Sequence, residues 1–213
     1  MTDGNTGKQP DLGLVVEVWK KTVDVQQHFN EICMKIRNFY ISLISALLAL
    51  IGVISTRLSD PYFQIWHYQV SAALPVLAAI VLGTLLFYFI DRHWYHRLLV
   101  GAVQNARLIE SDLTNQIPGI SLTEAIGKNS PLDVSGRDPG SQFWYWLGRV
   151  FGSDPRVKAD KMIHSDAKIA IFYKSVAWVF LIVFLVTAFS GGIHGSASPV
   201  LNPGPVGSAP PAK

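Results

Sequence analysis

FYISLISALLALIGVISTRLSDPYFQIWHYQVSAALPVLAAIVLGTLLFYFI, residues 39–90, contains two long runs without a charged side chain. The runs cover residues 39–56 and 70–90. Each approaches the roughly 20 apolar residues that a helix needs to cross the hydrocarbon core of a bilayer. The residues between the runs carry Arg57 and Asp60, which favour a loop in water. We therefore predict a hairpin of two membrane-spanning helices over residues 39–90.

The composition is typical of a membrane protein. Only 15% of the 213 residues are charged, whereas about a quarter are charged in an ordinary soluble domain. The net charge of +3 is too small to indicate a nucleic-acid partner, which requires a concentrated basic patch. The single cysteine, Cys33, excludes an intramolecular disulfide and fits a domain in a reducing compartment.

Residues 14–38 have the pattern of a cytosolic helix that continues into the first span. Their apolar side chains recur at alternating spacings of four and three, which defines a seven-residue seam with most charges off it. The preceding residues 1–13 lack the features of a signal peptide, and we expect them to be a disordered tail. The predicted seam consists of Val18, Thr22, Val25, Phe29, Ile32, Ile36 and Phe39.

The second span leads into residues 91–174, which we predict to be a cytosolic helical region. Its first helix has a seam of its own, so we expect it to pack antiparallel on residues 14–38 as a two-helix stalk. Ser121 and Glu124 have the spacing of a capping box for a short helix, which Gly127 can close. The second stalk seam consists of Tyr95, Leu99, Ala102, Ala106, Ile109 and Leu113.

Residues 142–151 form an aromatic segment within this cytosolic region. It combines two tryptophans with Phe143, Tyr145 and Phe151. We predict a short helix there, which either lies in the cytoplasmic interface or packs as a plug against the stalk. The interface is favoured because spans flank the region on both sides.

A third uncharged run, residues 175–193, is long enough to cross a membrane. The final residues 194–213 are rich in Gly, Ala, Ser and Pro, and we expect a disordered tail. The predicted fold is therefore an all-α membrane protein, with a two-span helical hairpin, a cytosolic helical stalk and a third C-terminal span.

The basic residues orient these spans. Ten lysines and arginines lie within residues 24–38, 91–107 and 155–174, against Arg57 and Lys213 on the other side. Because cytoplasmic flanks carry the excess of basic residues, we predict a multi-pass protein of the cell membrane with a cytoplasmic N-terminus.

The sequence contains no convincing chemical site, and we predict no catalytic residue, cofactor or metal. His93 and His96 could hold a metal together with His28, Glu31 or Cys33, but these residues do not make a closed ligand set. The polar residues of the loops, which would have to supply an enzyme's active site, are Asp133, Arg137, Asp138, His164, Ser165 and Asp166. His164, Ser165 and Asp166 are adjacent in sequence, which does not indicate a triad, because a triad is defined by geometry.

Three function classes follow from this pattern. The first is a non-enzymatic membrane effector or signalling component that forms homo-oligomers or binds a cytosolic protein partner through its stalk. The second is a channel or transporter subunit, in which the sparse polar lining would require several copies around a pore. The third is an enzyme, for which the polar loop residues named above are the candidates. A passive membrane scaffold for a cytosolic partner is a further alternative to the effector. Ala79 and Gly83 have the small-xxx-small spacing that lets helices approach closely in lipid.

The order of these elements resembles the SLATT-type small membrane effectors of bacterial conflict systems. The matching parts are residues 18–38, the two spans, and residues 91–115. The resemblance implies that the chain oligomerises into a membrane-disrupting pore when a partner senses infection. The third span and the aromatic segment depart from that pattern.

The predicted orientation can be tested with reporter fusions. We expect alkaline phosphatase fused after Pro211 to be active and the same enzyme fused at Met1 to be inactive, because three spans separate the two ends. Activity at Met1 alone would contradict the orientation, and cytosolic signals at both ends would reduce the spans to two.

Overall fold

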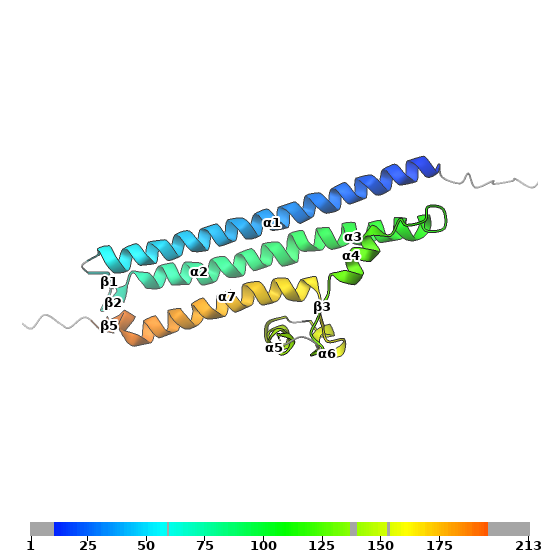
Figure 1. The fold of residues 1–213 in the computed structure, drawn as a ribbon. Coiled ribbons are helices and arrows are strands. Elements are labelled where there is room, and N and C mark those ends of the chain that lie inside the picture. The colour runs from blue at the N-terminus through cyan, green and yellow to red at the C-terminus, as the bar shows by residue number, and fades with distance from the viewer. Residues whose placement is uncertain (1–10, 59, 137–139, 153, 196–213) are drawn as a thin grey trace, which may run out of the picture.

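The computed structural model describes residues 11–58, 60–136, 140–152 and 154–195. These residues are mostly helical, and three helices are long and apolar enough to cross a membrane, as predicted. Figure 1 shows the three lying side by side along one axis. They are α1 (Leu12–Arg57), the continuous unit of α2 (Ala73–Tyr88), the π-helix η1 (Phe89–Tyr95) and α3 (His96–Leu113), and α7 (Ser165–Thr187), which ends in a second π-helical turn, η2 (Ala188–Gly192).

Helix α1 joins the predicted stalk helix and the first span without a break. Its 46 residues extend over about 70 Å, more than twice the roughly 30 Å of a hydrocarbon core. The helix begins at Leu12, because the carboxylate of Asp11 accepts a hydrogen bond from the Gly13 N–H at 3.0 Å. The predicted tail is therefore two residues too long, and residues 1–10 lie outside the described part of the chain.

Short strands close the end of the bundle opposite the stalk, which corrects the all-α prediction. Strands β1 (Tyr62–Ile65) and β2 (Tyr68–Ser71) form a hairpin, and β5 (Ile193–Gly195) pairs antiparallel with β2. The second span consequently begins at Ala73 instead of residue 70. Residues 194 and 195 belong to β5 and not to a tail, while residues 196–213 lie outside the described ranges.

Aromatic and branched side chains fill the space between the three long helices. The core consists of Tyr40 and Ile44 of α1, Ile80 of α2, and Ile169 and Tyr173 of α7. The Tyr40 ring centroid lies 5.0 Å from that of Tyr173, within the usual range for paired aromatic rings. The third span is therefore packed into the hairpin and forms part of its core.

The stalk of α1 and α3 forms as predicted, but the predicted seam of α1 is only partly correct: Thr22, Phe29, Ile32 and Ile36 are at least partly buried, and three members are not. Val18, Val25 and Phe39 are 48%, 45% and 64% exposed. The buried face is turned by about one residue and includes polar positions, because Trp19, Thr22 and Gln26 make hydrogen bonds to α3. The covered positions of the stalk part of α1 include Val15, Trp19, Thr22, Gln26, Phe29, Ile32, Cys33, Ile36 and Tyr40, and every residue of the predicted α3 seam is at least partly buried.

The residues between α3 and α7 form a small subdomain. It contains α4 (Leu122–Asn129), α5 (Ser141–Phe151) and α6 (Arg156–Ala159), with a two-stranded ladder of β3 (Leu132–Asp133) and β4 (Met162–Ile163). The aromatic segment is helical, as predicted, but it packs on α7 and not on the stalk. Gly148 permits α5 to pack closely on α6 and β4, because a Cβ there would lie 3.1 Å from Ile163 Cδ1 and 3.2 Å from Val157 Cγ1.

Helix α4 begins at the predicted place with a different cap. The Ser121 side chain makes no capping hydrogen bond, and Gly127 lies inside the helix. The carboxylate of Glu110 in α3 instead accepts hydrogen bonds from the Thr123 N–H at 2.9 Å, the Thr123 hydroxyl at 2.7 Å and the Glu124 N–H at 3.3 Å. Trp19 of α1 donates its indole N–H to the same carboxylate at 3.2 Å. Glu110 thus joins α1, α3 and α4.

These contacts predict a stability effect that depends on pH. Burial raises the pKa of Glu110, but the hydrogen bonds from Thr123, Trp19 and Glu124 outweigh it and lower the pKa below its ordinary value of 4.5. Because the folded-state pKa is depressed, the stabilisation is present above the unfolded-state pKa and is lost as the pH falls through the folded-state pKa. Glu110→Gln should therefore destabilise the docking of α4 by about 1.5–3 kcal/mol at pH 7.

Hydrogen exchange of the α4 amides measures this effect. Exchange in Glu110→Gln should be faster than in the wild type at pH 7, and the difference should shrink below the folded-state pKa, where Glu110 is protonated. The matched control is Glu124→Gln, because Glu124 is exposed and its carboxylate pairs with Lys128 across one helical turn. If the exchange rates of Glu110→Gln and the wild type differed by the same factor in acid as at pH 7, the ionised carboxylate would not be the stabilising group.

Candidate functional site

A buried ion pair lies where the stalk meets the spans. The guanidinium of Arg37 in α1 donates from Nε to Asp91 Oδ2 at 2.7 Å and from Nη2 to Asp91 Oδ1 at 3.2 Å. Asp91 belongs to η1 and has no exposed surface, whereas the Arg37 side chain is 29% exposed. Two parallel hydrogen bonds fix both the distance and the orientation of the pair. This contact joins α1 to the α2–η1–α3 unit.

Two further groups surround the pair, and we call Cys33, Arg37, Asp91 and Tyr173 the boundary cluster. The Tyr173 hydroxyl of α7 lies beside Asp91 without hydrogen-bond geometry, and the Cys33 thiol is buried next to both charges. All three long helices therefore meet at one carboxylate. One turn deeper in the spans, Tyr40 and Thr84 share a hydrogen bond of 3.1 Å.

The junction contains the π-helix η1, which carries Asp91. Its backbone is closed by hydrogen bonds between residues five apart, such as that from the His96 N–H to the Asp91 carbonyl. Because π-helical turns are rare and frequently lie at functional sites, this turn marks the junction as a candidate site. The sequence analysis expected a regular helix here, and no local sequence signal distinguishes the π-helical turn.

Basic and aromatic side chains surround the junction. Arg92 hydrogen-bonds to the Tyr88 hydroxyl and lies 5.6 Å from the centre of that ring, and the Lys174 ammonium lies 5.8 Å from the same centre. Such cation–π contacts are worth about 0.5–1 kcal/mol at exposed sites and more where water is excluded. Aromatic and basic side chains thus gather at the end of the second apolar helix, and Lys174 of α7 belongs to this group.

The histidines considered as metal ligands are separated. His96 Nε2 lies 2.9 Å from Asp166 Oδ1 of α7 without hydrogen-bond geometry, while the His93 ring contacts Phe89 in a tilted arrangement with centroids 5.7 Å apart. Cys33 belongs to the boundary cluster. Within the described ranges, no group of three or more His, Cys, Asp and Glu side chains could hold a metal ion.

The polar loop residues considered for an enzyme have local structural contacts. Asp133 Oδ1 accepts a hydrogen bond from the Ser135 N–H at 2.8 Å, which is a turn contact. His164 and Ser165 begin α7, and Asp166 contacts His96 and Arg156. Arg137 and Asp138 lie outside the described residues.

The boundary cluster can hold the helices in one relative position. Truncating one partner of a buried pair typically costs about 3–5 kcal/mol, because the remaining charge is left without compensation. Replacing both partners with apolar groups is often neutral, since the desolvation cost of both charges disappears as well. The pair therefore defines the register of the helices more than it adds net stability.

A double-mutant cycle tests this interpretation. Asp91→Leu should lower the free energy of unfolding in mixed micelles by about 3–5 kcal/mol, and Arg37→Met combined with Asp91→Leu should recover most of the loss. As a control, Lys35→Met removes an exposed partner of Glu31 and should change the free energy of unfolding by less than about 0.5 kcal/mol. A double variant as unstable as the sum of the two single variants would show that the side chains act independently.

Comparisons of the chain with protein-family models, with curated proteins and with solved structures find no match. The resemblance to SLATT-type effectors is neither supported nor contradicted by them, and it stays a prediction.

Proposed function

We propose that this chain is a non-enzymatic integral membrane protein that oligomerises and acts as a membrane effector or signalling component controlled through its cytosolic helices. The observation that carries the proposal is the continuity between stalk and spans. α1 crosses the junction unbroken, α2 continues into α3 through η1, and the Arg37–Asp91 pair holds the two units together. A rotation or shift of the stalk would therefore be transmitted to the spans.

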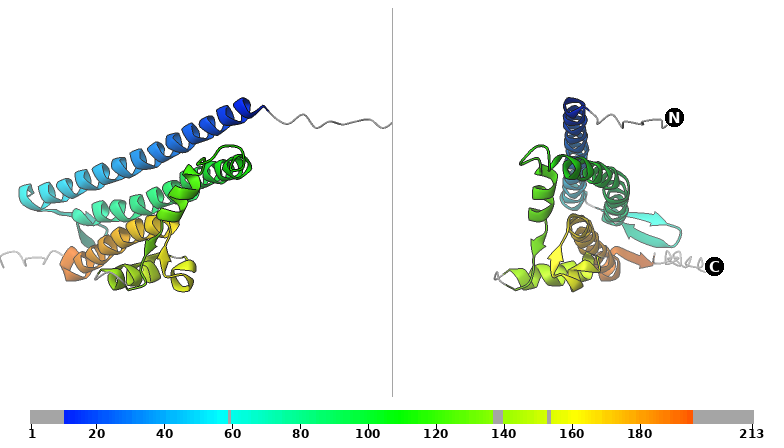
Figure 2. Two further views of the ribbon diagram at one scale, coloured as in Figure 1. Left: turned by 45° about the vertical axis from the view of Figure 1, so that its right-hand side comes forward. Right: turned by 90° about the vertical axis from the view of Figure 1, so that its right-hand side faces the viewer.

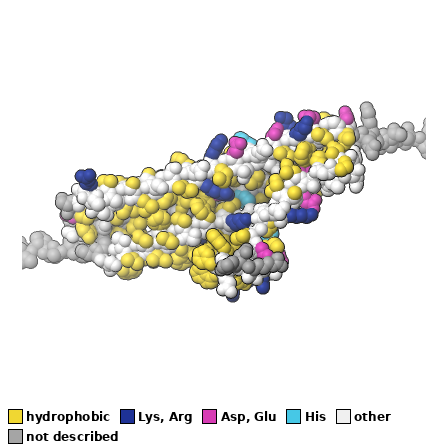
Figure 3. Space-filling view, viewed as in Figure 1, with side chains coloured by type: hydrophobic (Ala, Val, Ile, Leu, Met, Phe, Trp, Pro, Cys, Tyr) yellow, Lys and Arg dark blue, Asp and Glu magenta, His cyan; other side chains and the backbone are white. Residues whose placement is uncertain are grey.

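The distribution of side chains supports a membrane position with the stalk in the cytosol. Figure 3 shows hydrophobic side chains covering most of the half of the bundle that bears the strands, while charged side chains gather over the stalk half. The basic residues near the spans also lie mainly on the stalk side, in agreement with the positive-inside rule. We place the inner membrane boundary at η1.

Helix α5 supports the same placement. Its axis runs across the long axis of the bundle, so it would lie parallel to the membrane plane (Figure 2). One side of α5 packs on α7, while Phe143, Trp144 and Trp146 are 59%, 45% and 56% exposed. Such amphipathic rings favour the headgroup level, so we propose that α5 lies in the cytoplasmic interface.

The outer face of the hairpin supports association of several copies. Ala79 is exposed, and a Cβ on Gly83 would meet no atom within 4 Å, so both small residues face away from the core. Thr84, by contrast, is buried and bonded to Tyr40. Because side chains fill the core of one copy, a polar pathway would require a pore between copies.

The alternatives are a channel or transporter subunit and a passive scaffold for a cytosolic partner. A pore between copies would serve the channel alternative equally well. A passive scaffold does not require several copies of the chain to associate. The mass of the detergent-extracted particle, with and without cross-linking in membranes, separates the scaffold from the others, because a strict monomer would contradict both the effector and the channel.

Dye entry into cells tests the effector proposal. Overproducing the full chain, together with its co-encoded partners, should admit a normally excluded dye and collapse the membrane potential. Ala79→Leu combined with Gly83→Leu should reduce dye entry at matched membrane levels, because the larger side chains prevent close approach of helices without reducing hydrophobicity.

The control places added bulk on another outward face. Val179→Leu combined with Val183→Leu changes two exposed positions of α7 at the same spacing and should leave dye entry unchanged. Equal entry in the wild type and the Ala79/Gly83 variant, or no entry with every partner present, would exclude the pore in favour of a scaffold.

A further inference from the structure

A basic groove runs along η1 and the start of α3. Its volume of about 430 Å³ falls within the range of about 300–1,000 Å³ that is common for small-molecule sites. Four side chains that are basic or can be protonated line it, with one amide and one carboxylate. The polar lining consists of Arg92, His93, His96, Arg97, Gln104 and Asp166.

The positive charge of this groove is not neutralised by the part of the chain that the structure describes. Its lining carboxylate, Asp166, lies 2.9 Å from His96 and 3.8 Å from Arg156, which compete for its charge. Among the described residues, no carboxylate lies within ion-pair distance of Arg92 or Arg97. The groove is therefore suited to an anion.

Both arginines line the groove beside the π-helical turn, Arg92 from within η1 and Arg97 from the start of α3. Arg92 and Arg97 are five residues apart, which in a regular α-helix would place them about 140° apart around the axis. Hydrogen bonds between residues five apart bring such positions close to one above the other, so both arginines line the same groove. Two guanidinium groups on one side can share a phosphate, whose oxygens accept several hydrogen bonds.

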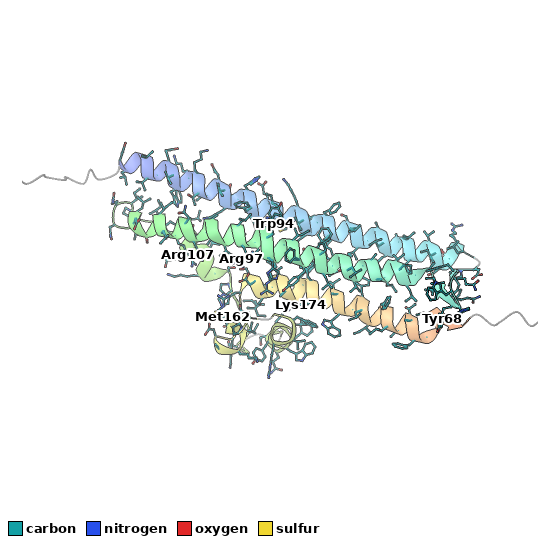
Figure 4. All side chains as sticks on the ribbon, turned by 180° about the vertical axis from the view of Figure 1, so that it is seen from behind. Tyr68, Trp94, Arg97, Arg107, Met162 and Lys174 are labelled. Carbon is teal, nitrogen blue, oxygen red and sulfur yellow. The ribbon has the colours of Figure 1, made fainter. Side chains whose placement is uncertain are left out.

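The groove opens at the level proposed for the cytoplasmic headgroups. Arg92 follows the last residue of the second span by two positions, and Trp94 beside it is 60% exposed, as expected for a residue of an interfacial aromatic belt. Figure 4 shows Trp94, Arg97 and Lys174 near the same level along the bundle, well away from Tyr68 at the strand end.

An apolar surface adjoins the groove on the membrane side. His93, which lines the groove, contacts the ring of Phe89 in the preceding turn, and Phe89 and Leu86 are 55% and 58% exposed. A phosphate bound at the arginines would therefore have space for attached acyl chains along these side chains. This continuity favours a lipid over a free phosphate ion.

We propose that this groove binds the phosphate of an anionic phospholipid from the cytoplasmic leaflet, with Arg92 and Arg97 as the phosphate ligands. His93 and Gln104 line the sides of the headgroup site. A passive anchor would carry the same groove, so the site does not depend on pore formation.

Native mass spectrometry of the detergent-purified full chain tests the proposal. Phosphatidylglycerol should bind about 30-fold more tightly than phosphatidylcholine with the same acyl chains, as expected for two basic residues near an anionic headgroup. Arg92→Gln combined with Arg97→Gln should abolish this preference. Lys20→Gln combined with Lys21→Gln removes the same charge from the far part of the stalk, and this variant should keep the preference for phosphatidylglycerol.

A second variant leaves every charge in place. Gly101 lines the groove and a Cβ there would meet no atom within 4 Å, so Gly101→Leu fills the groove without disturbing the helix, and should weaken phosphatidylglycerol binding. Equal binding of the two lipids, or full binding by the Gly101 variant, would overturn the proposal. Displacement of the lipid by an equal concentration of inorganic phosphate would assign the groove to a free anion instead.

Discussion

The burial of one carboxylate constrains the rest of this structure. Asp91 has no exposed surface, and an ionised carboxylate in such a place is tolerated only when it is paired and hydrogen-bonded. Arg37 meets this requirement with two hydrogen bonds from another helix. The pair thereby fixes the position of α1 along its axis and its rotation about that axis relative to η1. Apolar spans alone would not impose this, because dispersion contacts have little directionality and neighbouring registers differ little in energy. The ion pair makes one arrangement of the helices distinct from its alternatives.

The polar contacts of the stalk follow from the same rotation of α1. With Arg37 directed at η1, Gln26 reaches the Ala102 carbonyl at 3.3 Å and Thr22 accepts a hydrogen bond from Asn105 at 3.4 Å. Further along, Trp19 reaches Glu110, whose carboxylate also forms the start of α4. The stalk is thus held by a row of directional contacts at the spacing of a seven-residue seam. Apolar members of the predicted seam, such as Val18 and Val25, remain partly exposed beside this row.

The sequence predicts well whatever depends on local hydropathy and poorly whatever depends on a distant partner. The three long apolar helices could be predicted because the length and hydropathy of an uncharged run are local properties that do not depend on its neighbours. The rotation of α1 could not, because Gln26 and Trp19 lie off the apolar seam and only their partners in α3 show that they belong to the contact. The same holds for Asp91, whose partner is 54 residues away, and for the cap of α4, where a carboxylate from α3 replaces the Ser121 hydroxyl. The strands had a usable signal, since residues 62–70 are rich in aromatic and branched residues.

The π-helical turn connects the proposed lipid site with the proposed control through the stalk. Reverting η1 to a regular helix would rotate α3 relative to α2, and Arg97 would move away from Arg92 around the axis. The same rotation would strain the contacts of α3 with α1, because Gln26, Thr22 and Trp19 are positioned for the present arrangement. A phospholipid that bridges the two arginines would therefore stabilise the π-helical form, and a stalk partner that turns α3 would oppose it. Coupling between two binding sites is reciprocal. If the partner changes the affinity of the chain for the lipid by some factor, the lipid must therefore change the affinity of the chain for the partner by the same factor. Headgroup composition and partner binding would act on the spans through one turn of helix.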